Sequence, residues 1–412
     1  MTEWIGASEA ARRLGIKEAS LYAYVSRGVL TRRKAEGSRS SLFSADEVES
    51  LARRGRPRAV ARAVVVPAEL VIETAITEIT DDRLSYRGID ATSLAARSTI
   101  EDVAYLLWTG SLGDQVPAGW QATTQALAAG TAAQAALPAG TLPLERLQVI
   151  VPALAAADPL RLHLDPPAVM AAGRGLIAGM VGCLPQVGQD GASTAAGIAE
   201  RLIGKLCPAD PGPALADVLR AALVLLADHE LAASTLAARV AASMRADPYA
   251  VVATGLGAVG GALHGGASFG AEMMLRSAAE PADAVRAVGD LLRRGERIPG
   301  FGHFVYPGSD PRAVCLLGLL RAAVPGSPAL AIAEAVLAEG RRRALPAPNI
   351  DFALAAFATV AAMVPGAGEA IFAVARTAGW LAHALEEYER NTPIRPRGIY
   401  TGPIARLVSG SS

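Results

Sequence analysis

The pattern of apolar and polar positions predicts helices along most of the chain. Beyond about residue 66, apolar residues recur with helical spacing in long segments, among them 101–109, 213–227, 230–244 and 368–388. Ala and Leu, both strong helix formers, dominate these segments. Alternating patterns typical of strands are few, and no segment repeats at the period of a solenoid protein. The pattern therefore predicts an all-α body.

The N-terminal part of the chain has shorter elements. Residues 8–14 and 18–26 predict two short helices separated by Gly15, and two helices joined by a glycine-containing turn are typical of a helix-turn-helix. A basic stretch over residues 32–39 predicts a wing or hairpin. Residues 45–53 predict a third helix, because acidic side chains in its first turn suit the helix dipole.

Length and composition indicate more than one domain. The chain has 412 residues, of which 51% are hydrophobic and 19% charged, and this suits a large, well-buried protein. A basic segment with glycine and proline separates the two patterns described above. We predict a helix-turn-helix domain over 1–56, a linker over 57–65 and a helical domain over 66–412.

Charge and cysteine content exclude several classes of protein. The formal net charge is zero, so the whole chain has no electrostatic attraction for nucleic acid, although residues 1–62 carry roughly +6. The three cysteines form no CxxC pair and are too few for a disulfide framework, which fits a reducing compartment. The N-terminus shows no signal peptide, and the longest apolar stretch, 249–263, is too short for a bilayer. We expect a cytoplasmic protein without a membrane partner.

Three of the five histidines lie in unusual contexts. His229 stands between Asp228 and Glu230 at the end of an apolar segment, whereas His264 and His303 are surrounded by glycines. Glycines around an imidazole allow the backbone to approach a ligand closely. Each histidine taken alone is also compatible with an ordinary structural role.

One acid and three arginines stand out for their neighbours. Asp351 lies between Ile and Phe, so we expect partial burial, which raises the basicity of a carboxylate and suits a general base. The alternative is an N-cap of the following helix. Arg312, Arg376 and Arg395 are candidate anion ligands, since an arginine on an apolar helix must find an anion or a carbonyl. For Arg376 an internal salt bridge is the alternative.

Two further patterns carry no function in this interpretation. Residues 255–260 match GxGxxG, but no strand precedes them and no βαβ unit surrounds them, so a dinucleotide site is not expected. No histidine pair has the spacing of metal ligands with supporting cysteines or acids, so no metal site is expected.

Seven sequence blocks, taken together, resemble the citrate synthase family. In chain order they are ETAITEITDDRLSYRGID, ADHELAASTLAARV, ALHGGA, PGFGHFVY with DPRA, PNIDF, ARTAGWLAH and IRPRGIYTGP. The blocks follow the order of the family and span about residues 70–405. The resemblance implies a large and a small helical domain that close over a dicarboxylate, with the small one inserted at about residues 265–358. It also implies an obligate homodimer.

The resemblance implies a role for each candidate residue. His264 would stabilise the enol of acetyl-CoA, Asp351 would remove the methyl proton, and His303 would polarise the keto carbonyl of oxaloacetate. The dicarboxylate would be bound by four basic residues, namely His229, Arg312, Arg376 and Arg395. The resemblance implies that Arg395 comes from the partner subunit. Acetyl-CoA is then a substrate, and no cofactor is expected.

Several positions depart from the family pattern on the acyl-CoA side. Ser268 and Phe269 occur where family members often have Asn and an acid, and Phe304 occurs where bacterial members often have Arg. Pro307 replaces a basic residue that commonly meets the CoA phosphates, a role that Arg341–Arg343 could take over. The proposed catalytic residues are unaffected.

The N-terminal segment resembles the small winged helix-turn-helix of the MerR or excisionase type. Six basic residues could contact DNA phosphates: Lys17, Arg27, Arg32, Arg33, Lys34 and Arg39. A dimer would present two such modules, as palindromic sites require. The alternative is a docking or relic domain that never meets DNA.

Three functions follow from these observations. The first is citrate synthesis from acetyl-CoA, oxaloacetate and water. The second keeps the chemistry but takes propionyl-CoA, which gives 2-methylcitrate. The third is a transcription regulator in which the C-terminal body senses a metabolite and residues 1–56 bind DNA. A pure sensor has no need of a base such as Asp351, so the sequence favours an enzyme.

Overall fold

The computed structural model describes most of the chain. The described residues are 4–14, 21, 25, 30–34, 41–45, 47–48, 71–80, 82–113, 119–188, 196–261, 264 and 266–402. They fall into two compact units, Met1–Ile72 and Glu73–Ser412, which we describe separately. Within the described residues, no helix has both the length and the apolar character needed to cross a membrane.

The described residues of the N-terminal unit include a small antiparallel sheet and the helix α1. Strand β1 (Trp4–Gly6) and strand β2 (Arg32–Lys34) both pair with the central strand β3 (Ser41–Ser44). Helix α1 (Ala7–Leu14) begins one residue before the predicted 8–14. Buried apolar side chains of the unit include Ile5, Leu21, Leu30, Phe43 and Val48. The helices predicted over 18–26 and 45–53 lie largely outside the described residues, as does the whole linker predicted over 57–65.

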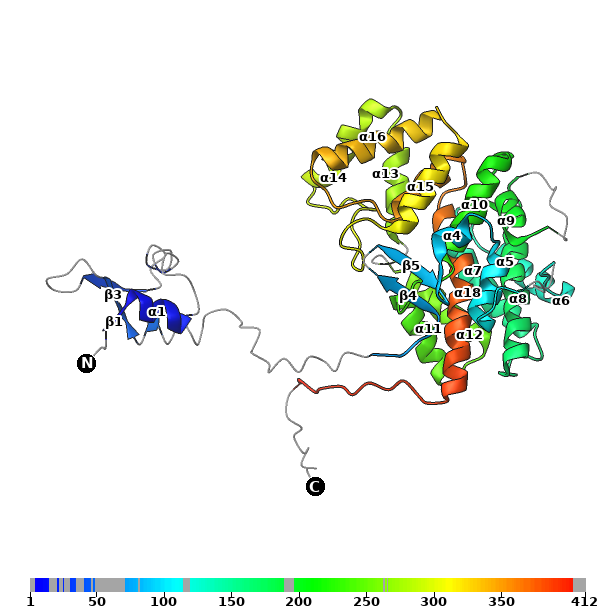
Figure 1. The fold of residues 1–412 in the computed structure, drawn as a ribbon, viewed down its shortest axis with the longest axis horizontal. Helices are drawn as coiled ribbons and strands as arrows, with labels where there is room; N and C mark the ends of the chain where they lie inside the picture. The colour runs from blue at the N-terminus through cyan, green and yellow to red at the C-terminus, as the bar shows by residue number, and fades with distance from the viewer. Residues whose placement is uncertain are drawn as a thin grey trace, which may run out of the picture. The chain divides into compact units, whose positions relative to one another are not determined.

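The C-terminal unit is a helical body (Figure 1). Helices are, in chain order, α4 (Ala91–Ala95), α5 (Ile100–Thr109), α6 (Thr124–Ala135), α7 (Pro143–Ala156), α8 (Pro166–Cys183), α9 (Ile198–Leu206), α10 (Pro213–Leu226), α11 (Ala233–Ser243), α12 (Pro248–Val259), α13 (Gly266–Arg276), α14 (Ala284–Arg293), α15 (Pro311–Ala323), α16 (Pro328–Arg342), α17 (Ile350–Val360) and α18 (Ala367–Arg390); a 3-10 turn, Pro281–Asp283, precedes α14. The expected all-helical body is thus confirmed.

Local sequence sets the helix ends. Thr99 caps α5 in a reciprocal capping box with Asp102, and the helix ends at Gly110, whose φ of 79° suits glycine. Proline occupies the first turn of α7, α8, α10, α12, α15 and α16, where its missing N–H is not needed.

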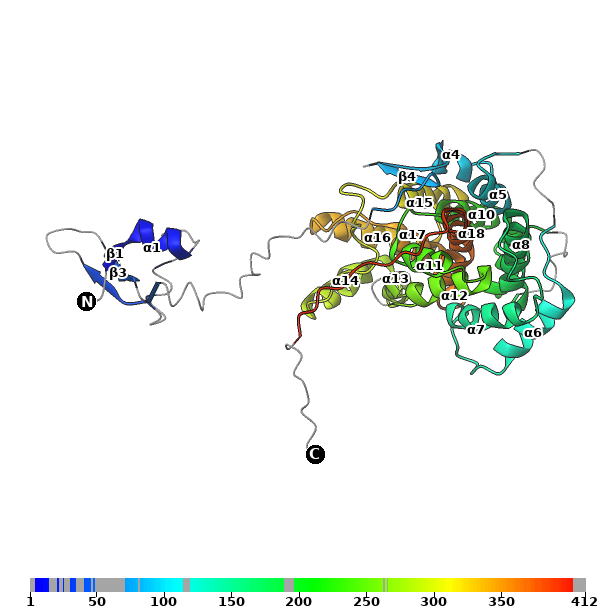
Figure 2. The ribbon, with the colours of Figure 1, turned by 90° about the horizontal axis from the view of Figure 1, so that it is seen from below.

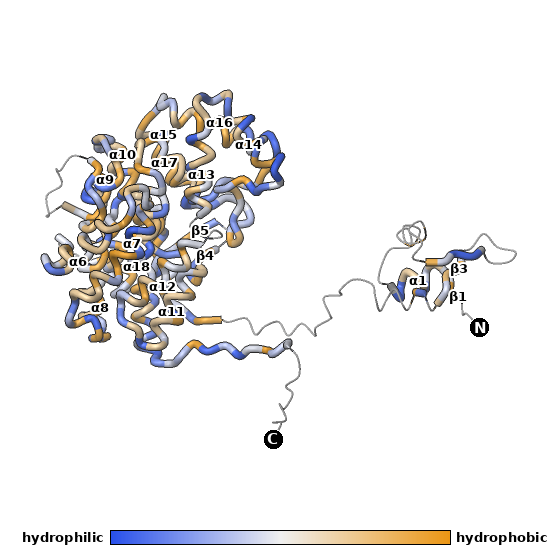
Figure 3. Tube along the Cα trace, turned by 180° about the vertical axis from the view of Figure 1, so that it is seen from behind, coloured by the Kyte–Doolittle hydropathy of each residue, from blue (hydrophilic) through white to orange (hydrophobic). Residues whose placement is uncertain are grey.

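Helix α18 forms the centre of the body. It packs against α5, α8, α10, α11 and α12, and Figure 2 shows it enclosed by these helices. Figure 3 shows that the hydrophobic colour predominates along these central helices. The approach of α12 is close, since a Cβ at Gly255 would lie 2.6 Å from the ring of Trp380. The GxGxxG match therefore lies at a helix–helix contact, within and just beyond α12.

A second small sheet adds strands that the pattern analysis did not predict. Strands β4 (Thr77–Thr80), β5 (Arg83–Tyr86) and β6 (Ile89–Asp90) pair antiparallel in that order. The buried Tyr86 hydroxyl reaches the carbonyl oxygens of Val224, Leu225 and Asp228 at 3.0–3.2 Å. The sheet thereby fixes the C-terminal end of α10, where the segment around His229 begins.

Helices α13 to α16 lie together at one end of the body in Figure 1. Helix α17 packs against α13, α15 and α16, and α14 packs against α16. Loops between these helices carry His303 and lead into the N-termini of α15 and α17. The division into large and small subdomains at about residues 265–358 stays a prediction.

Candidate active site

Five segments that are distant in sequence bring their polar side chains together. They are the turn after α10, the loop before α13, the loop before α15, the first turn of α17, and the buried middle of α18. Burial is the largest cause that lowers the pKa of His229. The charges of Arg312 and Arg376 lower it further, and so do the nearby His303 and His264. The ring centroids of His229 and His303 lie 5.3 Å apart, and His303 in turn contacts Arg312, so these residues share one region.

His229 lies in a turn rather than in a helix. The predicted helix over 230–244 begins only at Ala233, because Glu230 adopts a left-handed conformation with φ of 51°. The His229 side chain is buried, and its Nε2 lies 3.0 Å from the hydroxyl of Tyr306. Burial, reinforced by the two arginines, holds its pKa well below 6.5, so the imidazole is neutral at neutral pH.

His303 has a defined proton arrangement. Its Nδ1 accepts the backbone N–H groups of Val305 at 3.1 Å and Tyr306 at 3.4 Å, so the hydrogen resides on Nε2. That nitrogen lies 3.3 Å from Nη2 of Arg312, which is also a donor. Two donors that face each other cannot satisfy each other, but both can donate to one ligand oxygen. Burial lowers the pKa of His303 to about 4, which keeps the ring neutral.

Arg312 is oriented by the neighbouring Asp310. The carboxylate accepts from the backbone N–H, Nε and Nη2 of Arg312 at 3.0, 3.0 and 2.8 Å, and both side chains are buried. The same carboxylate accepts the backbone N–H of Ile350 at 3.0 Å. Asp310 therefore connects Arg312 to the N-terminus of α17, one residue before Asp351.

Asp351 is not the N-cap of its helix. Asn349 takes that position and accepts the N–H groups of Asp351 at 3.0 Å and Phe352 at 3.3 Å. Asp351, the second residue of α17, is half-buried as a residue. Burial raises its pKa to about 7, although Arg312 and Arg376 act in the opposite direction. A carboxylate with this pKa is a stronger base than an ordinary aspartate.

Arg376 is buried in the apolar middle of α18. Its Nε donates to the carbonyl of Leu226 at 2.8 Å, and its guanidinium lies 4.5 Å from the ring centroid of Phe372. Among the described residues, its buried Nη2 has no hydrogen-bond partner. Burial lowers the pKa of Arg376 to about 10, so it is charged at neutral pH. The carbonyl partner expected from the sequence is present, and one donor is left for an anion.

His264 lies beside Phe372 and Ser234. Its Nε2 lies 2.9 Å from the Ser234 hydroxyl, and its ring meets Phe372 edge-on at 5.6 Å between centroids. Burial and the charge of Arg376 lower its pKa to about 4. If the serine donates to Nε2, the hydrogen of the neutral ring is on Nδ1, which has no partner among the described residues. Nδ1 is then a hydrogen-bond donor for a ligand.

Arg395 is not brought to this site by the chain itself. It lies in the segment after α18, where residues 391–402 form neither helix nor strand, and its side chain is exposed. Of the basic residues predicted to meet DNA, Arg32, Arg33 and Lys34 form strand β2, with Arg33 lying 5.5 Å from the Trp4 ring centroid. Lys17, Arg27 and Arg39 lie outside the described residues.

Several neighbours of the site were not singled out from the sequence. Tyr306, Asp310, Ser234 and Phe372 contact His229, Arg312, His264 and Arg376, respectively. Asp310 could have been found as the acid that precedes Pro311 at a helix start. The other three carry no local signal, since a Tyr, a Ser and a Phe are ordinary residues of a core. No group of metal ligands occurs among the residues that the structure describes.

Comparisons with known proteins show the family to which the chain belongs. Residues 68–397 match the family described as "Citrate synthase, C-terminal domain". The citrate synthase of Haloferax volcanii is 34% identical over 81% of this chain and 94% of its own length. Citrate synthase 2 of Bacillus subtilis is 31% identical over 80% of this chain and 93% of its own length. A 2-methylcitrate synthase of Corynebacterium glutamicum is 30% identical over 79% of this chain and 91% of its own length.

A solved structure shares the fold. The citrate synthase of Thermoplasma acidophilum, solved with carboxymethyl coenzyme A and oxaloacetate, superimposes with a TM-score of 0.69 at 24% identity. The alignment covers 83% of this chain and 97% of that one. Fold and relatives together define an acyltransferase. The chain belongs to the citrate synthase family.

Proposed function

We propose that the chain condenses acetyl-CoA with oxaloacetate and water to give citrate and CoA. The observation that carries the proposal is the meeting of two buried guanidinium groups, three neutral imidazoles and one carboxylate of raised pKa. Two cations suit the two carboxylates of oxaloacetate. A base and a neutral hydrogen-bond donor suit the formation of an enol from a thioester.

The first step is enolisation of the thioester. Asp351 takes a proton from the acetyl methyl group, and the electron pair of that C–H bond forms the enolate. Nδ1–H of His264 donates a hydrogen bond to the thioester oxygen, where negative charge develops. Because the pKa of His264 is about 4, the ring donates as a neutral group.

The second step forms the new carbon–carbon bond. The enolate carbon attacks the keto carbon of oxaloacetate, and the keto oxygen takes a proton from Nε2 of His303, which is the donor that its backbone contacts leave free. Nη2 of Arg312 points to the same oxygen. Water then cleaves the citryl thioester, which releases citrate and CoA. The proton set free by this hydrolysis returns to His303, and Asp351 gives the methyl proton to solvent. The acyl-CoA is a substrate, and the reaction needs no further cofactor.

Oxaloacetate is bound by cationic and neutral donors. Arg312 and Arg376 face its carboxylates, and His229 completes the pocket beside Tyr306. Arg395 is exposed in its own chain, so we propose that it enters the site of a partner subunit and that the enzyme acts as a homodimer. Arg395→Leu should raise the oxaloacetate KM, and mixing it with an Arg376→Leu variant should restore part of the activity through mixed dimers.

A second candidate substrate is propionyl-CoA. It is favoured by the similarity to a 2-methylcitrate synthase. Release of CoA from purified protein, with oxaloacetate and each acyl-CoA in turn, tests both candidates. We expect the higher kcat/KM with acetyl-CoA and citrate as the product by mass spectrometry. A large preference for propionyl-CoA would replace citrate synthesis by 2-methylcitrate synthesis. If neither acyl-CoA leads to CoA release, the proposal that the chain is an enzyme is refuted.

For the N-terminal unit we propose a winged helix-turn-helix that contacts DNA. Supporting features are helix α1 and the antiparallel pair β2–β3, with exposed Arg32 and Arg33 on β2. Fluorescence anisotropy with a random duplex should show binding that weakens steeply with salt. An Arg32→Ala, Arg33→Ala double variant should bind more weakly; unchanged binding, or none by the parent chain, would remove the DNA role. If the enzyme proved inactive but oxaloacetate changed DNA affinity, the regulator hypothesis would replace the enzyme.

A further inference from the structure

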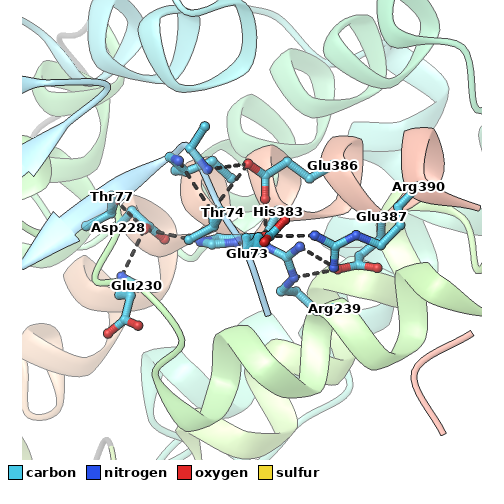
Figure 4. A network of polar contacts seen from close by, with 12 residues as sticks. Glu73, Thr74, Thr77, Asp228, Glu230, Arg239, His383, Glu386, Glu387 and Arg390 are labelled. Atoms are coloured by element: carbon cyan, nitrogen blue, oxygen red, sulfur yellow. Dashed lines mark hydrogen bonds and ion pairs between the residues drawn. The ribbon is translucent and has the colours of Figure 1, made fainter. Parts of the chain in front are cut away.

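A chain of polar side chains runs from Asp228, beside His229 in sequence, through His383 and Arg239 to Glu387 (Figure 4). At its inner end, Oδ2 of Asp228 accepts the Thr77 hydroxyl at 2.6 Å and the backbone N–H of Glu230 at 3.1 Å. Nε2 of His383 lies 3.3 Å from the same oxygen. We call Asp228, His383, Arg239 and Glu387 the Asp228 network; each is at most 1% exposed.

The chemistry of the groups fixes the direction of the hydrogen bonds. Nη1 of Arg239 lies 2.6 Å from Nδ1 of His383, and a guanidinium can only donate, so Nδ1 accepts. The ring donates from Nε2, which points to Asp228. Arg239 is held in turn by Glu387 at 2.6 Å. The network thus has a single hydrogen-bonding pattern from the end of α18 to Asp228.

Asp228 controls the conformation of the turn. Glu230 has a φ of 51°, which is unfavourable for a residue with a side chain and persists only where its surroundings enforce it. The carboxylate of Asp228 accepts the N–H of this residue and closes the turn around His229. The direction of the His229 imidazole toward Tyr306 therefore depends on where the Asp228 carboxylate is held.

Stability alone does not account for such a network. A buried ion pair gives little net stability compared with apolar side chains of the same volume, since both charges lose their hydration. The network also lies one residue from the His229 turn and contacts the first strand of the small sheet through Thr77. Its position therefore points to a role in the substrate pocket.

We propose that Asp228 is a positioning residue for oxaloacetate binding, and that His383, Arg239 and Glu387 hold its carboxylate in place. It acts through the His229 turn and does not touch the substrate. This inference rests on the proposed binding of oxaloacetate beside His229, Arg312 and Arg376.

Three variants of the full chain test the proposal. His383→Leu removes both the donor to Asp228 and the acceptor for Arg239, and we expect a rise of about tenfold or more in the oxaloacetate KM with kcat within about threefold of wild type. His383→Gln keeps a donor near Nε2 and should recover part of the affinity. Thr77→Val removes only the hydroxyl and should raise KM about fivefold, which is the effect of one hydrogen bond.

Arg146 offers a matched control within the same body. It is a buried arginine that hydrogen-bonds Gln134 and carbonyl oxygens in the α6–α7 region, and it has no contact with the network. Arg146→Met should lower the melting temperature about as much as Arg239→Met. Only Arg239→Met should raise the oxaloacetate KM and reduce the increase in melting temperature that oxaloacetate produces.

The outcomes separate the two proposals. If the His383, Arg239 and Thr77 variants lose stability but keep the oxaloacetate KM within twofold, the network is structural only and the inference is wrong. If wild type shows neither oxaloacetate-dependent CoA release nor stabilisation by oxaloacetate, the proposed function itself fails. The test holds even if His383→Leu does not fold, because Thr77→Val removes a single hydrogen bond to the same Asp228 carboxylate.

Discussion

Replacement of Asp351 by asparagine should lower turnover by orders of magnitude and stabilise the fold. The amide is nearly isosteric with the carboxylate but cannot take the methyl proton. General-base catalysis contributes about 10²–10⁴-fold to rate, and we expect a loss of that size in kcat. CoA release at saturating oxaloacetate measures it.

The effect on stability follows from the raised pKa of Asp351. Burial raises this pKa from 3.8 to about 7, and a tenfold change in proton affinity corresponds to about 1.4 kcal/mol, so the ionised form opposes folding by at most about 4 kcal/mol. Asp351 is only half-buried as a residue, and screening by nearby solvent reduces this to about 2 kcal/mol. Because the folded-state pKa lies above the unfolded-state value, wild-type stability falls as the pH rises from about 4 through about 7.

Asparagine carries no such charge, so the gain in stability should appear across that pH window. Urea unfolding at pH 8 should show Asp351→Asn to be the more stable protein, and the difference should vanish near pH 4. Glu369→Gln is a matched comparison, because burial and neighbouring carboxylates also raise the pKa of Glu369 to about 7. It should show the same pH-dependent gain and keep most of the turnover. Near-normal kcat in Asp351→Asn would refute the assignment of the base, and equal stability at pH 8 would refute the burial argument.

Three further substitutions test neighbouring contacts. Ser234→Ala removes the hydroxyl at Nε2 of His264 and should lower kcat about tenfold with little change in the oxaloacetate KM. An unchanged kcat would show that the serine does not orient the ring. Asp310→Asn breaks a buried ion pair and should lower the free energy of unfolding by about 3 kcal/mol. Glu334→Gln breaks the exposed Arg321–Glu334 pair and should lower it by less than about 1 kcal/mol. Similar losses in the two variants would contradict the assigned burial. Gly379→Ala places a methyl group 2.5 Å from the Ala227 carbonyl oxygen. It should lower the free energy of unfolding by about 1–3 kcal/mol and raise the oxaloacetate KM. Gly257→Ala, where the methyl group meets open space, should change neither quantity.

The positions of the long helices could be predicted from the sequence because their apolar faces repeat regularly. The segments 101–109, 213–227 and 368–388 each correspond to a helix with ends within two residues, because caps and prolines act locally. Strands β4 to β6 could not be predicted, since each has two to four residues and leaves no room for an alternating pattern. The late start of α11 was also missed, because tertiary contacts of Asp228 hold Glu230 in a left-handed conformation.

The candidate site could be predicted as a set of residues but not as a set of contacts. His229, His264, His303 and Asp351 stood out through their neighbours in sequence. Their contacts include partners far away along the chain, as with Tyr306 for His229, and no local pattern encodes such a pairing. The distinction between Asn349 and Asp351 as helix cap required the backbone geometry. Arg395 stays a prediction, because its proposed site belongs to a second copy of the chain.

A crystal structure of the full chain with oxaloacetate and an unreactive acyl-CoA analogue tests the central claim most directly. The account predicts the keto oxygen at Nε2 of His303, carboxylates at Arg312 and Arg376, and the acyl carbon between Asp351 and Nδ1 of His264. A diacid bound elsewhere, or an Asp351 carboxylate out of hydrogen-bonding reach of the acyl carbon's position, would contradict it.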